Sequence, residues 1–463
     1  MVTRVSKVAA LQELGLGLSA QGRFEEALVS LQEAEALAHR VRFGMGPFLV
    51  PDVVHARASV LYDAGRWEDA VDVAREAARL RRATGSTDSD QLARLSDSLE
   101  LEANSLTRLQ RLQEADAVSA EVISMRARLP WSERARALLN RAAMLTEAGR
   151  HAEGLEAVLE LVRSARDRPA SDGGDATYSS GLVNLAVQLR MNGRWHEAVE
   201  VQQLAIGEVR LAAHVGGDDV QADLAIALAN LANLHLESGR PEDAEAPGAE
   251  ALALRERLAP RSLSSLAALT DSLNNHGIVL AELGRPAEAE PLVARCVDLR
   301  RRLHDAQPRA FGRALANALV THCDVLTRCG RAEAGLVAGR EGVEMLRRLA
   351  AGDVRAYGPW LAGGTDTLAE ATAAALGADR ALAVTEESVD LARRALADNP
   401  AGFASSHATI LLAAAERHAA DQPEQARGWA GEALDLVSAL SAAEPEAYAV
   451  VLERARRVAA SLG

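Results

Sequence analysis

The sequence is poor in the residue types on which several common protein classes depend. Aromatic residues make up only 3% of its 463 residues, which argues against a β-sandwich or β-barrel. Its three cysteines, Cys296, Cys323 and Cys329, are too few for a disulfide framework and fit a reducing cytosol. No run approaches the roughly 20 apolar residues of a membrane span. We therefore expect a cytoplasmic protein without a membrane partner.

Positive charge is also scarce. The chain has 51 basic and 65 acidic residues, a net charge of −14, and Lys7 is its only lysine. A surface this acidic repels phosphate backbones and anionic lipids, so we expect no nucleic-acid partner. Arginine in place of lysine is typical of genomes rich in G and C, such as those of actinobacteria.

Motifs that carry catalysis or bind cofactors are missing as well. The sequence contains no GxxxxGK[ST], HExxH or GxSxG pattern. Gly15 to Ala20 matches a GxGxxA loop, but no strand precedes it and it falls inside a predicted helix. His276 and His322 occupy equivalent positions without a third ligand nearby in sequence, which favours packing over metal binding. We therefore predict no catalytic residue, no metal site and no cofactor.

What the sequence does contain is a recurring Gly-Arg turn between two apolar-periodic stretches. It occurs at Gly22, Gly65, Gly149, Gly193, Gly239, Gly284 and Gly330, each followed by arginine. From Gly149 onward the steps are 44, 46, 45 and 46 residues, taken as differences between these positions. Further turns are predicted near residues 110, 377 and 421. Glycine suits the left-handed conformation that ends a helix. The spacing predicts about ten helical hairpins.

Small residues stand in phase with these turns. Seven residues before the turn lie Gly15, Ala58, Ala103, Ala142, Ala186, Ala232, Gly277 and Cys323. Five residues after it lie Ala27, Ala70, Ala115, Gly154, Ala198, Ala244, Ala289 and Gly335. A bulky residue at either position would force the two helices of a hairpin apart. The pattern therefore predicts closely packed antiparallel helices over residues 1–463 as a single solenoid, closed by a capping helix over 445–463.

Arginines and a segment rich in glycine and proline are two further features of the sequence. The second helices end in arginines such as Arg300 and Arg347, which we interpret as offsetting the negative end of the helix dipole. A basic binding stripe is the alternative. The segment from Phe43 to Pro51 is rich in glycine and proline, and it is predicted to be irregular.

With turn and small pair in register, the chain resembles the tetratricopeptide repeat (TPR) family. The stretch LANLANLHLESGRPEDAEAPGAEALALRERL is most similar to the long-period subtype of kinesin light chains and of sensor regions in bacterial signalling ATPases. The usual repeat is about 34 residues. The resemblance implies an all-α, right-handed superhelical solenoid and a non-catalytic scaffold or adaptor that holds a protein or peptide partner in its concave groove. Two alternatives remain open: a sensor or regulatory segment of a larger bacterial signalling protein, and an enzyme with a pocket inside the superhelix.

The resemblance also indicates groove residues. In the family, the position nine residues before the turn faces the groove, and here it holds asparagine in four successive repeats. The amide both donates and accepts hydrogen bonds, which suits a ligand backbone. The alternative is that these amides bond to one another or to a neighbouring helix. The predicted partner-binding residues are Asn140, Asn184, Asn230, Asn233, Asn274, Asn275, Arg136, Arg190, Asp271, Asn317 and Asp324. The set lacks the lysines of the carboxylate clamp of chaperone-binding members, so a chaperone tail is not expected.

The N-terminal helix carries an apolar stripe and no polar capping element. Val5, Val8, Leu11, Leu14 and Leu18 fall on or near one helical face. We therefore expect residues 1–40 to form an interface, by self-association or with a partner. The alternative is that the second repeat and the segment from Phe43 to Pro51 fold back and cover the stripe.

Overall fold

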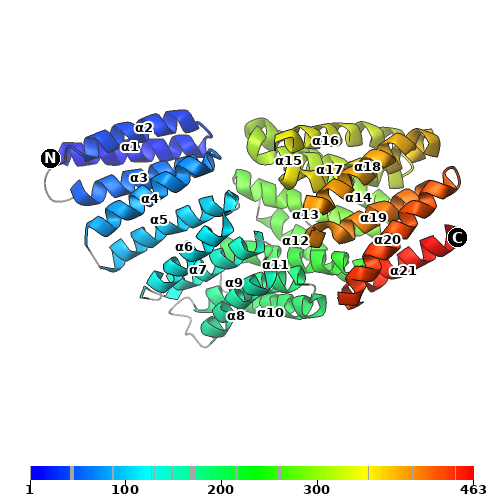
Figure 1. Cartoon of the computed structure of the whole chain (residues 1–463), viewed down its shortest axis with the longest axis horizontal. Coiled ribbons are helices and arrows are strands. Elements are labelled where there is room, and N and C mark those ends of the chain that lie inside the picture. Colours follow the sequence, from blue (N-terminus) through cyan, green and yellow to red (C-terminus); the bar gives the residue numbers. More distant parts are fainter. Residues whose placement is uncertain are drawn as a thin grey trace. The chain divides into compact units, whose positions relative to one another are not determined.

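The protein is all-α, as the computed structural model shows, with 21 helices among the described residues (Figure 1). Within each of its two compact units, consecutive helices pack against one another. The described residues are 2–41, 46–85, 88–109, 111–126, 128–129, 131–147, 150–166, 174–192, 194–213, 217–258, 262–352, 354–398, 400–443 and 445–462. The chain divides into two compact units, Met1–Asn192 and Gly193–Gly463, which are described separately. The predicted fold class, a TPR-like array of antiparallel helix hairpins, is confirmed.

Unit 1 holds four hairpins followed by a single helix. They are α1 (Val2–Ala20) with α2 (Phe24–Ala38), α3 (Gly46–Asp63) with α4 (Trp67–Ala83), α5 (Ser89–Arg108) with α6 (Leu112–Arg126), α7 (Trp131–Glu147) with α8 (His151–Arg166), and then α9 (Gly174–Met191). The turns between paired helices are described at Gly22 and Gly65, whereas Gln110 and Gly149 lie outside the described residues.

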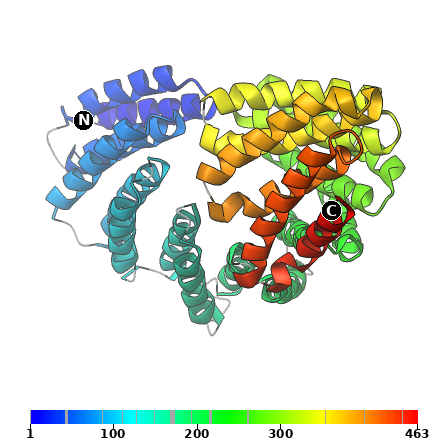
Figure 2. The ribbon, with the colours of Figure 1, turned by 45° about the vertical axis from the view of Figure 1, so that its right-hand side comes forward.

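Unit 2 begins with a single helix, continues through five hairpins and ends with another single helix. They are α10 (Trp195–Ala213), α11 (Asp218–Glu237) with α12 (Pro241–Arg257), α13 (Leu263–Glu282) with α14 (Pro286–Ala306), α15 (Pro308–Arg328) with α16 (Ala332–Gly352), α17 (Val354–Leu376) with α18 (Ala378–Asp398), α19 (Pro400–Arg417) with α20 (Pro423–Ala443), and α21 (Pro445–Leu462). Figure 2 shows α15 to α18 lying side by side as yellow and orange ribbons.

The Gly-Arg turns have one geometry wherever they are described. Gly22, Gly65, Gly239, Gly284 and Gly330 take φ values between 72° and 75°. The following arginine donates its backbone N–H to the carbonyl oxygen five residues earlier, as when Arg240 N bonds the His235 oxygen at 2.8 Å. In four of these turns the arginine side chain then pairs with an acidic residue in the first turn of the next helix, as Arg285 does with Glu288 at 2.7 Å, whereas Arg331 pairs with Glu290 of α14 at 3.1 Å. Both residues of the Gly-Arg pair thus have a structural role.

Close approach within hairpins explains the small residues. Ala27, Ala70, Ala232, Ala244 and Ala289 are each no more than 2% exposed. A Cβ added at Gly277 would collide with Val293 Cγ2, and one at Gly335 would lie 2.9 Å from the Cys323 carbonyl oxygen. Neither position has room for a side chain, so the packing prediction is confirmed.

The first helices of successive hairpins form the inner face within each unit. Helices that are not consecutive in the chain also pack together among the described residues, and these contacts join the first helix of one hairpin to the first helix of the next, as α11 does with α13 and α15 with α17. The single helices α9 and α21 take part in the same way, through α7 and α19. A layer whose members touch their neighbours lies on the shorter, concave side of a curved array. In unit 2 the curvature brings Val450 of α21 within 3.7 Å of where a side chain at Gly239 would begin.

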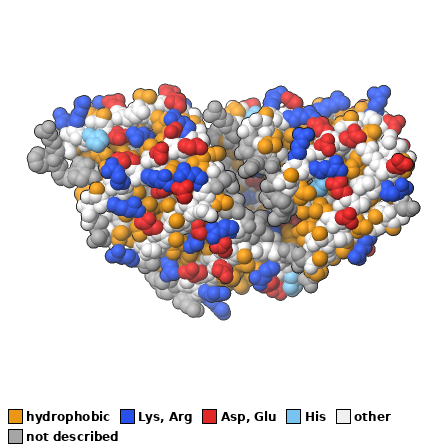
Figure 3. All heavy atoms as spheres, in the orientation of Figure 1, with side chains coloured by type: hydrophobic (Ala, Val, Ile, Leu, Met, Phe, Trp, Pro, Cys, Tyr) orange, Lys and Arg blue, Asp and Glu red, His pale blue; other side chains and the backbone are white. Residues whose placement is uncertain are grey.

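The arginines that end the second helices connect neighbouring repeats. Arg82 pairs with Glu121 at 2.7 Å, Arg301 with Glu341 at 2.6 Å and Arg347 with Glu387 at 2.8 Å, each pair joining second helices of successive hairpins. Figure 3 shows basic and acidic side chains interspersed over the visible face. The sequence interpretation as helix-dipole cations overlooked these partners, because each glutamate belongs to the next repeat along the chain. Each exposed pair contributes about 0–1 kcal/mol.

The segment predicted to be irregular is partly helical. Helix α3 begins at Gly46 and continues through Pro51, whereas residues 42–45 lie outside the described part. Proline there removes one backbone donor. Val50, Val53 and Val54 are buried in the same helix, 8% exposed or less, and this burial offsets the lost hydrogen bond.

The apolar stripe of α1 is largely covered inside unit 1. Val8 is fully buried and Leu18 is 8% exposed, in a core shared with α2 and α3, whereas Leu14 and Leu16 remain 53% and 43% exposed. Self-association through residues 1–40 stays a prediction, with a smaller apolar surface than the sequence suggests. None of the described helices combines the length and the apolar character needed to cross a membrane.

Candidate functional site

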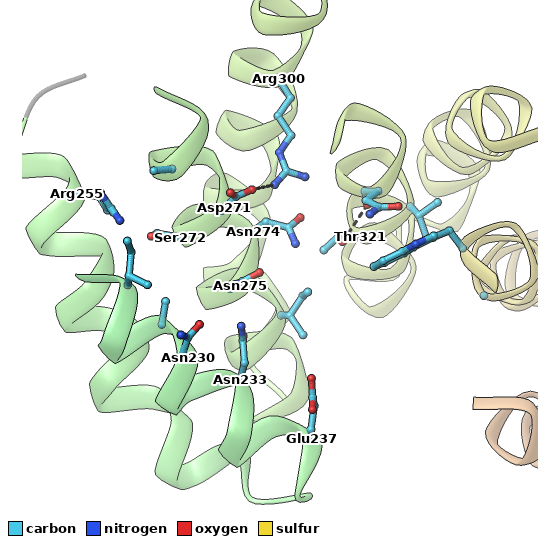
Figure 4. Close-up of a pocket in the computed structure, with 18 of the residues that line it drawn as sticks. Asn230, Asn233, Glu237, Arg255, Asp271, Ser272, Asn274, Asn275, Arg300 and Thr321 are labelled. Atoms are coloured by element: carbon cyan, nitrogen blue, oxygen red, sulfur yellow. Dashed lines mark hydrogen bonds and ion pairs between the residues drawn. The ribbon is translucent and has the colours of Figure 1, made fainter. Parts of the chain in front are cut away.

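Unit 2 contains a groove of about 940 Å3 on its inner face. Four successive first helices, α11, α13, α15 and α17, line it, and the ends of the second helices α12 and α14 add one arginine each. Figure 4 shows the helices carrying these side chains. This volume lies within the range of roughly 300–1,000 Å3 typical of ligand sites.

Five asparagines dominate the polar lining of the groove. Asn230 and Asn233 come from α11, Asn274 and Asn275 from α13, and Asn317 from α15. Within the described chain, no hydrogen bond joins any of these five amide side chains to another residue. Asn274 is only 8% exposed, and its Oδ1 is buried without a donor among the described residues. An unpaired buried amide oxygen costs about 1–3 kcal/mol, so this atom favours an external donor.

One ion pair fixes the middle of the groove. Arg300 Nη2 donates to Asp271 Oδ1 at 2.6 Å, its Nη1 donates to the Ala314 carbonyl oxygen at 2.6 Å, and its Nε donates to Thr270 Oγ1 at 3.2 Å (Figure 4). Arg300 is 5% exposed, whereas the Asp271 side chain is 65% exposed. The guanidinium therefore joins α13, α14 and α15, and Asp271 presents its free edge to the groove.

An aromatic residue lies at the α17 side of the groove. Trp360 is 47% exposed, and the Arg313 guanidinium lies 5.3 Å from the centre of its ring, a cation–π distance. Gly363 and Gly364 follow on the same helix and also line the groove. An exposed indole beside a surface without side chains offers an apolar contact for a ligand.

The sequence predictions divide between this groove and other places. Six of the predicted residues line it: Asn230, Asn233, Asp271, Asn274, Asn275 and Asn317. Three lie elsewhere with partners inside the fold: Asn140 donates to Glu100, Arg136 pairs with Asp97 and Glu133, and Asp324 pairs with Arg328. The Asn184 amide donates to the Ser180 carbonyl oxygen at 2.9 Å, and Arg190 lies in the last turn of α9. Their roles in binding stay predictions.

Other lining residues were not predicted. Arg255, Arg300, Ile226 and Trp360 were missed. The two arginines were missed because they belong to second helices, which the family resemblance places outside the groove. Trp360 carried a usable signal, since it is one of only five tryptophans and two glycines follow it closely.

The histidines considered as metal ligands are packed into the fold. His276 is 9% exposed, and His322 lies 3.9 Å from Glu290. Burial lowers the pKa of each imidazole from its ordinary value. Among the described residues, no three His, Cys, Asp or Glu side chains come together as a metal-ligand set.

Burial of histidines predicts a dependence of stability on pH. Desolvation lowers the pKa of His55, His235, His276, His322, His407 and His418. Between the lowered and the ordinary pKa, the unfolded chain binds protons that the folded chain does not. The stability that these neutral histidines contribute is therefore complete above the ordinary pKa of 6.5. It is lost as the pH falls through their lowered pKa values in the folded chain.

We expect the urea concentration at the midpoint of unfolding to decrease when the pH is lowered from about 7.5 to about 5.5. Most carboxyl groups titrate below this pH range. His196→Gln is the control, because that imidazole is 77% exposed and the variant should keep the same pH dependence. A midpoint that is constant across this window would contradict the expectation.

Comparison with known protein families identifies two of the repeats. The family described as tetratricopeptide repeat matches residues 224–261 and 269–308, which include most of α11 to α14. No curated protein matches the chain.

Solved structures share the fold over most of the chain. The apo form of RapI is 11% identical, with a TM-score of 0.54, over 85% of this chain and 99% of that one. A Rap protein complexed with Competence and Sporulation Factor is 14% identical, with a TM-score of 0.53, over 84% and 98%. The apo quorum sensor NprR from B. thuringiensis is 14% identical, with a TM-score of 0.51, over 83% and 99%. At these identities the likeness concerns the fold alone. Residues 224–261 and 269–308 therefore carry tetratricopeptide repeats, and the same Gly-Arg turns and small-residue pairs recur outside these two segments.

Proposed function

We propose that unit 2 binds a linear peptide segment of a partner protein in the groove, without catalysing a reaction on it. The observation that carries this proposal is the set of five groove-lining asparagines whose amides have no hydrogen-bond partner within the described chain. An extended peptide exposes one donor and one acceptor per residue, which is what such amides can pair with.

Repeat spacing also suits an extended segment. Packed neighbouring helices stand roughly 8–10 Å apart, and an extended chain rises about 3.3 Å per residue. Each hairpin thus spans about three ligand residues, so amides from α11, α13 and α15 would meet the ligand backbone at intervals. A rigid small molecule would not use so long a ladder of equivalent groups.

The chemistry of the lining favours binding over catalysis. The described lining residues include no histidine and no cysteine, and the acidic residue at the centre, Asp271, is held by Arg300. Nucleophilic or general acid–base catalysis needs a nucleophile and a base in contact. The lining hydroxyls of Thr321 and Thr367 instead donate to the backbone carbonyl oxygens of Asn317 and Gly363, which supports an adaptor or scaffold.

A sensor role in signalling is the second candidate. Two of the structurally similar proteins are a quorum sensor and a Rap protein solved with Competence and Sporulation Factor. A groove that takes a peptide serves a sensor as well as an adaptor. In that role, occupancy of the groove would change how the chain engages an effector, whereas an adaptor would only hold its partner.

Replacing Asn230, Asn233 and Asn275 together with alanine tests the proposal. Each lost hydrogen bond is worth roughly 0.5–1.5 kcal/mol, so we expect the binding free energy of the peptide to weaken by about 1.5–4.5 kcal/mol. Ligands come from a display library of random linear peptides selected on the wild-type chain, and calorimetry measures affinity. Circular dichroism should show unchanged helicity.

Asn184→Ala is the matched control, because that amide already bonds the Ser180 carbonyl oxygen. The peptide affinity of Asn184→Ala should equal that of the wild type. A loss as large as that of the triple variant would instead assign Asn184 to binding, as the sequence pattern predicts. Unchanged affinity in the triple variant would refute the role given to the amides.

A further inference from the structure

An ion pair with a buried arginine recurs at one place in three of the hairpins. An aspartate in the first helix pairs with an arginine near the end of the second helix, and in each case the two residues are 29 positions apart across the turn. The pairs are Asp52–Arg81 at 3.0 Å, Asp97–Arg126 at 2.8 Å and Asp271–Arg300 at 2.6 Å. The three arginine side chains are 0–6% exposed, so each withdrawn guanidinium has a carboxylate supplied by its own hairpin.

The hairpin formed by α11 and α12 keeps the arginine and lacks the aspartate. Relative to the turn at Gly239, Arg255 occupies the position of the paired arginines, and Ile226 occupies the position of the aspartates. Both residues line the groove, and the isoleucine is 46% exposed. No ion pair within 4 Å and no hydrogen bond joins Arg255 to a described residue. Figure 4 accordingly draws a dashed line from Arg300 to Asp271 and none from Arg255.

The positive charge of Arg255 is offset only by carboxylates that do not contact it directly. Burial lowers the pKa of its guanidinium, and the nearby carboxylates of Asp223 and Asp271 oppose that shift. Asp271 is already bonded to Arg300, and burial raises the pKa of Asp223, with the carboxylate of Asp219 adding to the shift. A partly buried cation without a direct partner is unfavourable, and a carboxylate with two oxygens matches the guanidinium fork.

We propose that Arg255 receives a carboxylate of the bound peptide, in the place that an internal aspartate fills in the hairpins α3–α4, α5–α6 and α13–α14. This inference rests on the peptide-binding function proposed above and adds the charge of the ligand. The exposed Ile226 side chain beside it would pack against the apolar part of the same ligand residue. The carboxylate could come from an Asp or Glu side chain or from the C-terminus of the peptide.

Restoring the missing aspartate tests the inference most directly. In Ile226→Asp the hairpin should regain its internal ion pair, so Arg255 would no longer be available to the ligand. We expect peptides selected on the wild-type chain to carry a carboxylate at one fixed place. Their affinity for Ile226→Asp, and for Arg255→Met, should fall about tenfold or more. Ile226→Asn is the matched control, since it changes the shape of the side chain without adding charge, and it should lose much less.

Peptide variants identify the source of the carboxylate. A Glu→Gln or Asp→Asn change in the selected peptide should reproduce the loss on the wild-type chain and cause little further loss on Ile226→Asp if a side chain binds. Amidation of the C-terminus should do so if the terminal carboxylate binds. The urea midpoint of Ile226→Asp should be no lower than that of the wild type, which separates lost binding from lost folding.

Each other outcome overturns the inference. Selected peptides without a common carboxylate, or equal affinity for wild type and Ile226→Asp, would refute the role of Arg255 and leave peptide binding intact. Failure of the wild-type chain to select any peptide would refute the proposed function, and this inference with it.

Discussion

Replacing Arg126 with methionine should destabilise unit 1 by about 3–5 kcal/mol. Its side chain is fully buried, and it donates to Ser96 Oγ at 2.9 Å, to Asp97 Oδ1 at 2.8 Å and to Glu100 Oε2 at 2.9 Å. Methionine fills much of the volume but leaves the Glu100 carboxylate, 15% exposed, without its cation. An unpaired, mostly buried carboxylate lowers the free energy of unfolding by more than the burial of one methionine side chain raises it.

Hydrogen exchange along α5 and α6, followed with urea unfolding, measures this loss. Arg82→Met is the matched control, because Arg82 is 49% exposed and its pair with Glu121 lies at the surface. That variant should lose less than about 1 kcal/mol. The loss for Arg126→Lys should fall between the two, since lysine keeps the charge and loses the guanidinium fork that reaches Ser96, Asp97, Glu100 and the Glu133 carbonyl oxygen. Similar losses for Arg126→Met and Arg82→Met would contradict the central role of the buried arginine.

The sequence predicted the hairpins because the signals that make them are local. A glycine at positive φ ends a helix wherever it stands, and a small residue allows close approach within the same hairpin. Gly239, Ala232 and Ala244 together define one hairpin within a single short stretch of chain. Nothing beyond that stretch is needed to place the turn.

The candidate site was predicted only as far as it follows the first helices. Asn230 and Asn275 repeat in phase with the turn, so a one-dimensional pattern finds them. Arg255 and Arg300 reach the groove from second helices, and whether they are paired depends on a residue 29 positions earlier in the chain. A periodic scan that compared each of these arginines with its counterpart across the turn would have found the missing aspartate.

The same limit applies to the second-helix arginines. Their abundance was visible, but an ion pair between repeats depends on the rotation of one hairpin relative to the next. Arg301 meets Glu341 because both lie on the outer layer of neighbouring repeats. Helix-dipole reasoning treats each helix alone, so it explained the position of the charge and not its partner.

Replacing Gly342 of α16 with valine should both destabilise unit 2 and weaken peptide binding. A Cβ there would lie 2.9 Å from the Ala316 carbonyl oxygen, 3.1 Å from Leu319 Cβ and 3.2 Å from Val320 Cγ2, all on α15. Backbone cannot yield as a flexible side chain does, so α15 must shift as a whole. Overpacking of this kind costs about 1–3 kcal/mol and sometimes more.

The binding effect follows from what α15 carries. Asn317, Val320 and Thr321 line the groove, so displacement of this helix moves them away from the positions set by α11 and α13. Gly428→Val on α20 is the matched control, because that glycine is exposed with open space where a Cβ would go. It should be neutral or slightly stabilising, since glycine is the poorer helix former. Calorimetry with the selected peptide and urea unfolding of both variants decide the matter. If Gly342→Val keeps wild-type affinity while losing stability, the α15 wall of the groove contributes nothing to binding, and the ligand contacts must be confined to α11 and α13.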